Sequence, residues 1–204
     1  IRGLKNYQHR ILYYGPMSKR ELKKQLNASH SVAENLIPVE YKSTPTVEVT
    51  EPKVVFAQYD AKQIYYMQYT CGGDMFDVTL DPSVRLYNEY FSGGMNAIVF
   101  QEMREARGLA YSSYAYLGQG KTCNEPYYFH AFIATQNDKM QQAIEAFDEI
   151  IENMPQSEAA FELTKQGILT GMATGRTTKM DILWKYIGDL RFGITDINRT
   201  EAVY

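Results

Sequence analysis

The feature that most constrains the fold is the stretch 91–117, FSGGMNAIVFQEMREARGLAYSSYAYL, in which glycines interrupt helix-like and strand-like sequence. Gly93 and Gly94 are expected to end a helix, because glycine alone adopts positive φ without steric cost. Gly108 occupies the position of a glycine at a helix C-terminus. The run LAYSSYAYL after it is rich in β-forming residues and predicts a strand. The stretch therefore predicts two helices, a tight turn and a strand.

The helix between the glycine breaks is expected over 97–107, with Asn96 as its N-cap. Arg104 then lies in the last turn, where the helix dipole favours a cation, and Tyr111 is the third residue of the following strand. A guanidinium and a phenol hydroxyl both donate hydrogen bonds, so side by side they could bind a carbonyl or an oxyanion. In the alternative interpretation, Arg104 caps the helix and Tyr111 packs in the core. Residue types alone favour this alternative.

The run GGMNAIVFQEMREARGLAYSSYAY resembles the second-domain signature of the pitrilysin/insulinase family of zinc metallopeptidases, which includes the mitochondrial processing peptidases. The match is close from Gly93 to Ser112, and the helix pattern stays similar to about Gly193. In active pairs of that family, an arginine and a tyrosine from the half without zinc reach across a chamber to the scissile peptide. The resemblance implies that Arg104 and Tyr111 are these substrate-binding residues.

The zinc motif of that family, H-x-x-E-H on a helix, does not occur in this sequence. Its chemistry requires two histidines on one helical face and a glutamate that activates water. His9, His30 and His130 are far apart in the sequence, and a lone histidine is most often structural. We therefore predict no metal ligand, no cofactor and no catalytic residue in this chain alone. The resemblance implies that another domain of the parent protein holds zinc.

Charge and composition limit the partners. The net charge of −3 gives no reason to expect a nucleic-acid partner. No apolar run is long enough to predict a membrane span. The two cysteines, Cys71 and Cys123, are either free or joined in one disulfide, so the cellular compartment stays undetermined. Because the sequence lacks an initiator Met and ends in a strand-like TEAVY, we expect an excerpt of a longer polypeptide.

Outside the glycine-rich stretch, alternation and turn signals predict strands over 7–14, 53–58, 63–70 and 126–135. The pair 53–58 and 63–70 is expected to form a hairpin that ends at Gly72-Gly73. Side chains suited to N-capping predict helices that begin after Ser18, Asp81, Asp138, Ser157 and Thr178. This order is not a strict βαβ alternation. It predicts an α+β fold, a two-layer sandwich of one mainly antiparallel sheet with helices on one face, and the resemblance implies the same architecture.

We expect three parts along the chain. Residues 1–37 are interpreted as the tail of a preceding family domain, with a strand and a capped helix. Residues 38–52, which contain several prolines, are interpreted as a linker. Residues 53–204 are interpreted as the zinc-free family domain, truncated at its C-terminus.

Two functions remain open. In the first, the chain is a non-catalytic domain of a zinc metalloendopeptidase, forms part of the peptide-binding chamber and supplies Arg104 and Tyr111 to the substrate carbonyl. Its partners are then a peptide substrate and the zinc-bearing half, in the same polypeptide or in a partner subunit. In the second, it is a structural or protein-binding homologue without protease activity, like the core subunits that the family contributes to respiratory complexes. The spacing of Arg104 and Tyr111 favours the first, although zinc-bearing halves also carry it.

Overall fold

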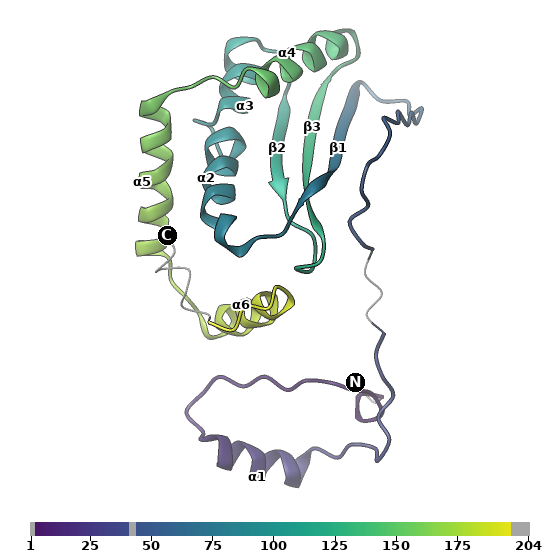
Figure 1. The fold of residues 1–204 in the computed structure, drawn as a ribbon, viewed down its shortest axis with the longest axis vertical. Coiled ribbons are helices and arrows are strands. Elements are labelled where there is room, and N and C mark those ends of the chain that lie inside the picture. Colours follow the sequence, from purple (N-terminus) through teal and green to yellow (C-terminus); the bar gives the residue numbers. More distant parts are fainter. Residues whose placement is uncertain (1–2, 41–43, 197–204) are drawn as a thin grey trace.

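The computed structural model describes residues 3–40 and 44–196 (Figure 1). A sheet carries a layer of helices on one face, and a long N-terminal segment extends away from both. In chain order the helices and strands are α1 (Lys19–Ser29), β1 (Gln63–Met75), α2 (Asp81–Ser92), α3 (Ile98–Phe100), the π-helical segment η3 (Gln101–Ala106), β2 (Ser112–Gly118), β3 (Pro126–Gln136), α4 (Met140–Glu152), α5 (Glu158–Thr174) and α6 (Lys179–Arg191). Short 3-10 turns are η1 (Leu4–Asn6), η2 (Val78–Leu80) and η4 (Asn137–Lys139).

The sheet is antiparallel, with the strand order β1-β3-β2. β2 and β3 form a hairpin around the loop after Gly118, and β1 pairs with the other side of β3. On the face toward the helices, Tyr66 lies opposite Ile133, and Ala131 lies opposite Ala115. The predicted α+β class, with one antiparallel sheet and helices on one face, is confirmed.

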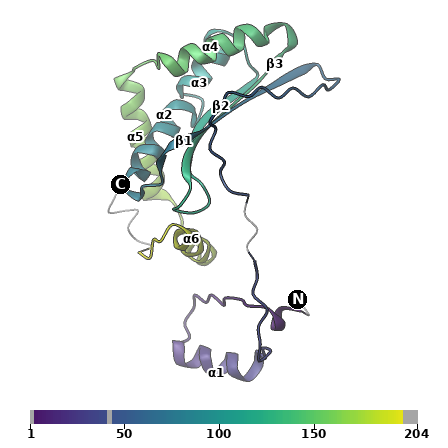
Figure 2. The ribbon, with the colours of Figure 1, turned by 45° about the vertical axis from the view of Figure 1, so that its right-hand side comes forward.

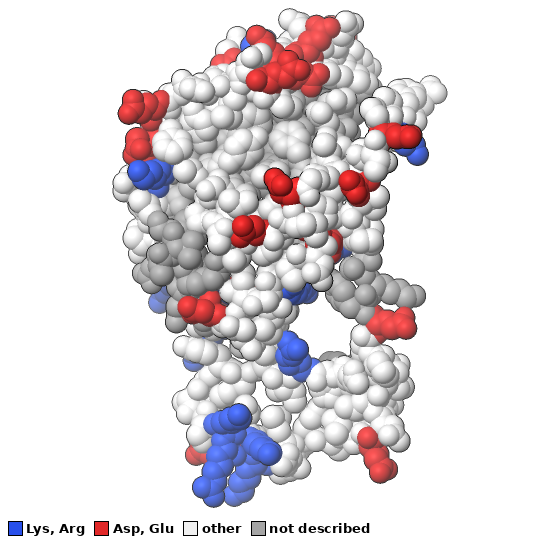
Figure 3. Space-filling model, viewed as in Figure 1, with Lys and Arg blue, Asp and Glu red and all other residues white. Residues whose placement is uncertain are grey.

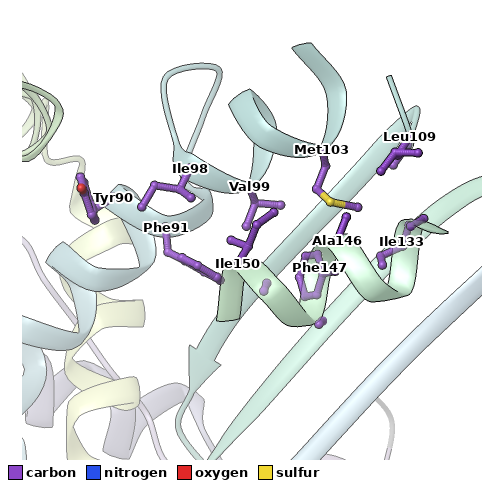
Figure 4. Packing of buried hydrophobic residues seen from close by; sticks show 14 residues of the cluster. Tyr90, Phe91, Ile98, Val99, Met103, Leu109, Ile133, Ala146, Phe147 and Ile150 are labelled. Atoms are coloured by element: carbon purple, nitrogen blue, oxygen red, sulfur yellow. The ribbon is translucent and has the colours of Figure 1, made fainter. Parts of the chain in front are cut away.

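The hydrophobic core lies between this sheet face and the helices (Figure 4). Phe91 of α2, Met103 of η3 and Phe147 of α4 meet Ile133 of β3 there, and all four side chains are almost completely buried. Burial of a side chain of this size contributes about 1.5–3 kcal/mol relative to exposure. The core therefore fixes η3, which carries Arg104, against the sheet.

The opposite face of the sheet carries exposed side chains. Tyr65 and Met67 of β1 are 66% and 68% exposed. In the neighbouring strands the ring of Tyr114 stacks on Phe132 at 5.1 Å between centroids, and on His130 at 5.9 Å. One buried and one open face is the usual arrangement of an antiparallel sheet and explains the alternation in the sequence.

The outer edge of β2 is closed by side chains of α2. Asn88 donates from Nδ2 to the carbonyl of Leu117 at 2.9 Å and accepts from its amide at 2.8 Å. Ser92 accepts from the amide of Ala115 at 3.1 Å. These side chains take the place of a neighbouring strand and satisfy backbone groups that an edge strand leaves unpaired.

The first predicted strand is wrong. Residues 7–14 are extended but form no strand, and the one pairing there is an isolated parallel bridge between Tyr7 and Ile37. A strand needs a neighbour along its length, and the described chain offers this segment none. The N-cap expected at Ser18 is confirmed. Ser18 accepts from the amide of Glu21, and the Glu21 carboxylate accepts from the amide of Ser18, which completes a capping box.

The predicted hairpin between 53–58 and 63–70 is also wrong. Residues 53–58 form no strand, and Val54 and Phe56 are 96% and 79% exposed. The second half is a strand, but β1 does not stop at the two glycines and continues to Met75. Gly72 and Gly73, with φ of +148° and +94°, lie in a shift of register toward β3 and so form a bulge instead of an end.

Residues 44–62 run beside the sheet and join it to the N-terminal segment (Figure 2). The amide of Val49 donates to the carbonyl of Cys71 in β1 at 2.8 Å. Thr46 donates from its amide and hydroxyl to Glu125, at 2.9 and 2.7 Å, and these bonds lower the pKa of Glu125 to about 2.

The buried Cys71 and the exposed Cys123 are both free thiols.

Two of the predicted N-caps on the later helices are confirmed and two are wrong. Ser157 caps α5, and Thr178 forms a capping box with Asp181 at the start of α6. Asp81 is instead the first residue of α2, with Leu80 at its N-cap. Asp138 lies within η4, which lengthens the start of α4 by a tighter turn.

Figure 3 shows basic residues gathered over α1 at the bottom of the view and acidic residues over α4 at the top. The four cations of α1 (Lys19, Arg20, Lys23 and Lys24) are exposed.

The helices of the described chain include none with the length and apolar content that crossing a bilayer requires.

Candidate functional site

The helix that carries Arg104 differs from the predicted one. α3 makes a single α-helical turn that begins after Ala97, not after Asn96, and it continues as the π-helical segment η3. A π-helix is wider than an α-helix and rotates the residues that follow it, and such segments are frequent at functional sites. The predicted span 97–107 therefore contains a helix, but the direction of Arg104 depends on a change of helix type that periodicity does not reveal.

The glycines at the two ends of this helix act differently. Gly108 has φ of +57°, as the sequence predicts for a helix C-terminus. Gly93 has φ of −76°, so the expected positive φ is wrong there. It closes α2 for a steric reason, because a Cβ on Gly93 would lie 2.5 Å from Cα of Glu89.

Backbone hydrogen bonds fix the turn between η3 and β2. The amide of Gly108 donates to the carbonyl of Arg104 at 3.2 Å, and the amide of Leu109 donates to Met103 at 2.9 Å. The amide of Tyr111 donates to the carbonyl of Ala134 in β3 at 3.1 Å. The buried hydroxyl of Thr135 donates to the carbonyl of Leu109. Arg104 and Tyr111 are thus attached to the same rigid turn.

The side chains of Arg104 and Tyr111 lie together. The guanidinium carbon of Arg104 is 5.7 Å from the ring centroid of Tyr111 and 5.0 Å from that of Phe100. Its Nε lies 3.8 Å from a carboxylate oxygen of Glu105, a long contact between half-exposed groups. Tyr111 is 75% exposed, so the alternative in which Tyr111 packs in the core is wrong.

These two residues line a cavity of about 330 Å³ at the end of the sheet where β1 begins and β3 ends. The cavity has a second cation, Lys139, whose ammonium donates to the carbonyl of Gly108 at 3.3 Å. Two amide side chains, Gln63 and Gln136, complete its polar lining and come from paired positions of β1 and β3. The sequence motifs did not point to these three residues. Pairing the start of β1 with the end of β3 would have brought the two glutamines together.

Comparison with known proteins gives the family. The profile of the peptidase M16 inactive domain matches residues 10–168, most of the chain. The chain belongs to the peptidase M16 inactive domain family. This confirms the resemblance of the glycine-rich stretch, and it makes the chain a non-catalytic domain of an M16 peptidase-like protein.

Solved structures support the same fold. A crystal structure of a peptidase M16 inactive domain from Pseudomonas fluorescens superimposes with a TM-score of 0.61 at 20% identity, covering 92% of this chain and 43% of that one. A protease from Helicobacter pylori superimposes with a TM-score of 0.62 at 13% identity, covering 92% of this chain and 46% of that one. The M16 chain described here thus spans less than half the length of either. No curated protein matches it.

The histidines of this M16 domain do not converge on a metal site. His9 and His30 meet each other through their Nε2 atoms, 2.7 Å apart, and Nδ1 of His9 lies 2.7 Å from the carbonyl oxygen of Tyr7. His130 lies in β3 between tyrosine rings. Within residues 3–40 and 44–196, no three metal-ligating side chains gather in one place.

Proposed function

We propose that this M16 domain forms part of a peptide-binding chamber, with Arg104 and Tyr111 as donors to the carbonyl of a bound peptide. The partner is a zinc-bearing half, in the same polypeptide or in a separate subunit, and residues 53–204 are the domain that faces it. The observation that carries the proposal is the exposed Tyr111 side chain, whose ring lies against the Arg104 guanidinium at a cavity, on a turn held by backbone hydrogen bonds.

The two side chains are suited to this role for different reasons. Phe100 and Tyr111 hold the Arg104 guanidinium by cation–π contacts, which leave its N–H groups in the plane able to reach a ligand. The phenol of Tyr111 offers a second donor. Donors held in place before the reaction stabilise the charge that develops on a peptide carbonyl oxygen in the transition state. Zinc bound by another domain would supply the activated water for hydrolysis.

The test uses the intact parent protein with a peptide substrate. Tyr111→Phe removes the hydroxyl and keeps the ring, so it should lower kcat by about a hundredfold and leave KM and melting temperature nearly unchanged. Arg104→Lys should also lower kcat, because an ammonium does not reproduce the planar fork. Tyr14→Phe, which removes an exposed hydroxyl in the N-terminal segment, is the matched control.

If both donors act on one oxygen, the double variant should lose less activity than the product of the two single losses. Full kcat in Tyr111→Phe would refute the role of this hydroxyl. Absence of any peptidase activity in the intact parent protein would instead favour the structural homologue that the family also contains.

A further inference from the structure

The cavity beside Arg104 has an unusual balance of charge. Its described lining holds two cations, Arg104 and Lys139, and no carboxylate. Glu105 makes a long 3.8 Å contact with Arg104, and Asp138 precedes Lys139 in η4. Two positive charges that share one hollow repel each other, and an anion between them would remove this repulsion.

The other acidic groups near η3 are already paired. Arg107 contacts Glu149 of α4 at 2.8 Å and Glu102 at 3.6 Å. Arg107, and not a cation of the cavity, therefore holds these two carboxylates. Lys139 itself touches a neutral acceptor, the carbonyl of Gly108, and donates only one of its three N–H bonds there.

The neutral lining also donates hydrogen bonds. Gln63 and Gln136 are directly paired between β1 and β3, so their side chains leave the same face of the sheet. Each amide group carries two N–H donors. Two cations and two amides therefore suit an anion with several lone pairs. In a peptide, the ligand of the proposed function, that anion is a carboxylate.

We propose that this cavity recognises a carboxylate of the bound peptide, with Lys139 as the residue that determines the preference. The proposal rests on the proposed function, because the same cavity places the peptide carbonyl at Arg104 and Tyr111. The carboxylate belongs either to a glutamate or aspartate side chain or to the end of the peptide chain. The preference is then for peptides that present a carboxylate to this cavity, and it is set by a residue outside the Arg104–Tyr111 pair.

The experiment measures peptide binding to the 204-residue chain by NMR titration, followed at the amide of Gly108. The probes are acetyl-AAEAA-amide, acetyl-AAQAA-amide and acetyl-AAQAA with a free carboxyl end. At least one of the two carboxylate peptides should bind about two- to fivefold more tightly than the neutral one, the range of a half-exposed ion pair. The preference should weaken as salt is raised. The peptide that shows it identifies the source of the carboxylate.

Variants then assign the preference. Lys139→Gln should abolish it, Lys139→Arg should keep it, and Lys24→Gln, which removes an exposed cation of α1, should leave it unchanged. Equal binding of all three peptides, or a preference that survives Lys139→Gln, would overturn the proposal. The result is separable from the test of the proposed function. A carboxylate preference with full kcat in Tyr111→Phe would retain the cavity and reject the oxyanion role, and the converse would reject the cavity alone.

Discussion

Gly108 offers the sharpest test of the turn that joins Arg104 to Tyr111. Its φ of +57° lies in the left-handed region, and a Cβ built there meets no heavy atom within 4 Å. A substitution therefore creates no clash, and its cost comes from the backbone alone. Gly108→Ala should destabilise the domain by about 1–2 kcal/mol, the cost of the left-handed conformation for an L-residue. Gly108→Val should reach about 3 kcal/mol, because its branched Cβ tolerates this region worst.

Gly167 provides a matched control of opposite sign. It lies inside α5, and a Cβ there also meets no atom within 4 Å. Because the backbone is helical at that position, Gly167→Ala should stabilise the domain by about 0.5–1 kcal/mol. The same addition of one methyl group should therefore lower stability at one position and raise it at the other.

Urea unfolding monitored by circular dichroism measures the change in unfolding free energy for both variants. In a thermal melt, each kcal/mol should move the melting temperature by about 2–4 °C in a chain of this size. If Gly108→Ala proves as stable as the parent while Gly167→Ala behaves as expected, the turn does not have the left-handed conformation and the placement of Tyr111 beside Arg104 loses its basis. If both variants destabilise equally, the backbone argument itself is wrong.

Three further predictions concern the core, the sheet edge and acid stability. Phe147→Ala should cost about 3–5 kcal/mol in urea unfolding, because the side chain is fully buried; a loss below 1 kcal/mol would contradict the packing of α4 on the sheet. Asn88→Ala should cost about 1–3 kcal/mol by leaving both backbone groups of Leu117 unpaired, while an unchanged midpoint would show that water replaces the amide. The folded pKa of Glu125, about 2, lies below its ordinary value of 4.5, so the native state binds fewer protons than the unfolded state between these values. Unfolding free energy should therefore fall as pH drops from about 4.5 toward 2, and Glu125→Gln should lose this part of the acid dependence. An identical pH profile in that variant would show that the pKa of Glu125 is not lowered in the folded state.

Local signals in the sequence predicted local structure well. The N-caps expected at Ser18 and Thr178 form, each in a capping box with the residue three positions later. The positive φ of Gly108 also follows from its neighbours alone. Each of these features depends on residues within about one turn of chain. Local signals were not always sufficient, since the N-caps expected at Asp81 and Asp138 do not form.

Two strand predictions failed because a strand needs a distant partner. Residues 7–14 and 53–58 have the composition of strands, but β propensity describes how well a residue fits a pleated surface and does not supply a neighbouring strand. Val54 and Phe56 are almost fully exposed for this reason. Residues 63–70 have a similar pattern and do form a strand, because β3 pairs with them residue by residue.

The candidate site combines both kinds of signal. Arg104 and Tyr111 are joined by one short turn, so sequence spacing alone suggested that they meet, and they lie 5.7 Å apart. Gln63 reaches the cavity only through the pairing of β1 with β3, which places it opposite Gln136. Lys139 reaches it because β3, which it follows, lies beside the turn before β2. The π-helical segment also sets the direction of the Arg104 side chain, and the periodicity of the sequence does not predict a π-helix. A motif search therefore finds the pair that would contact the peptide backbone, whereas the residues that would distinguish one peptide from another become visible only when the strands are paired.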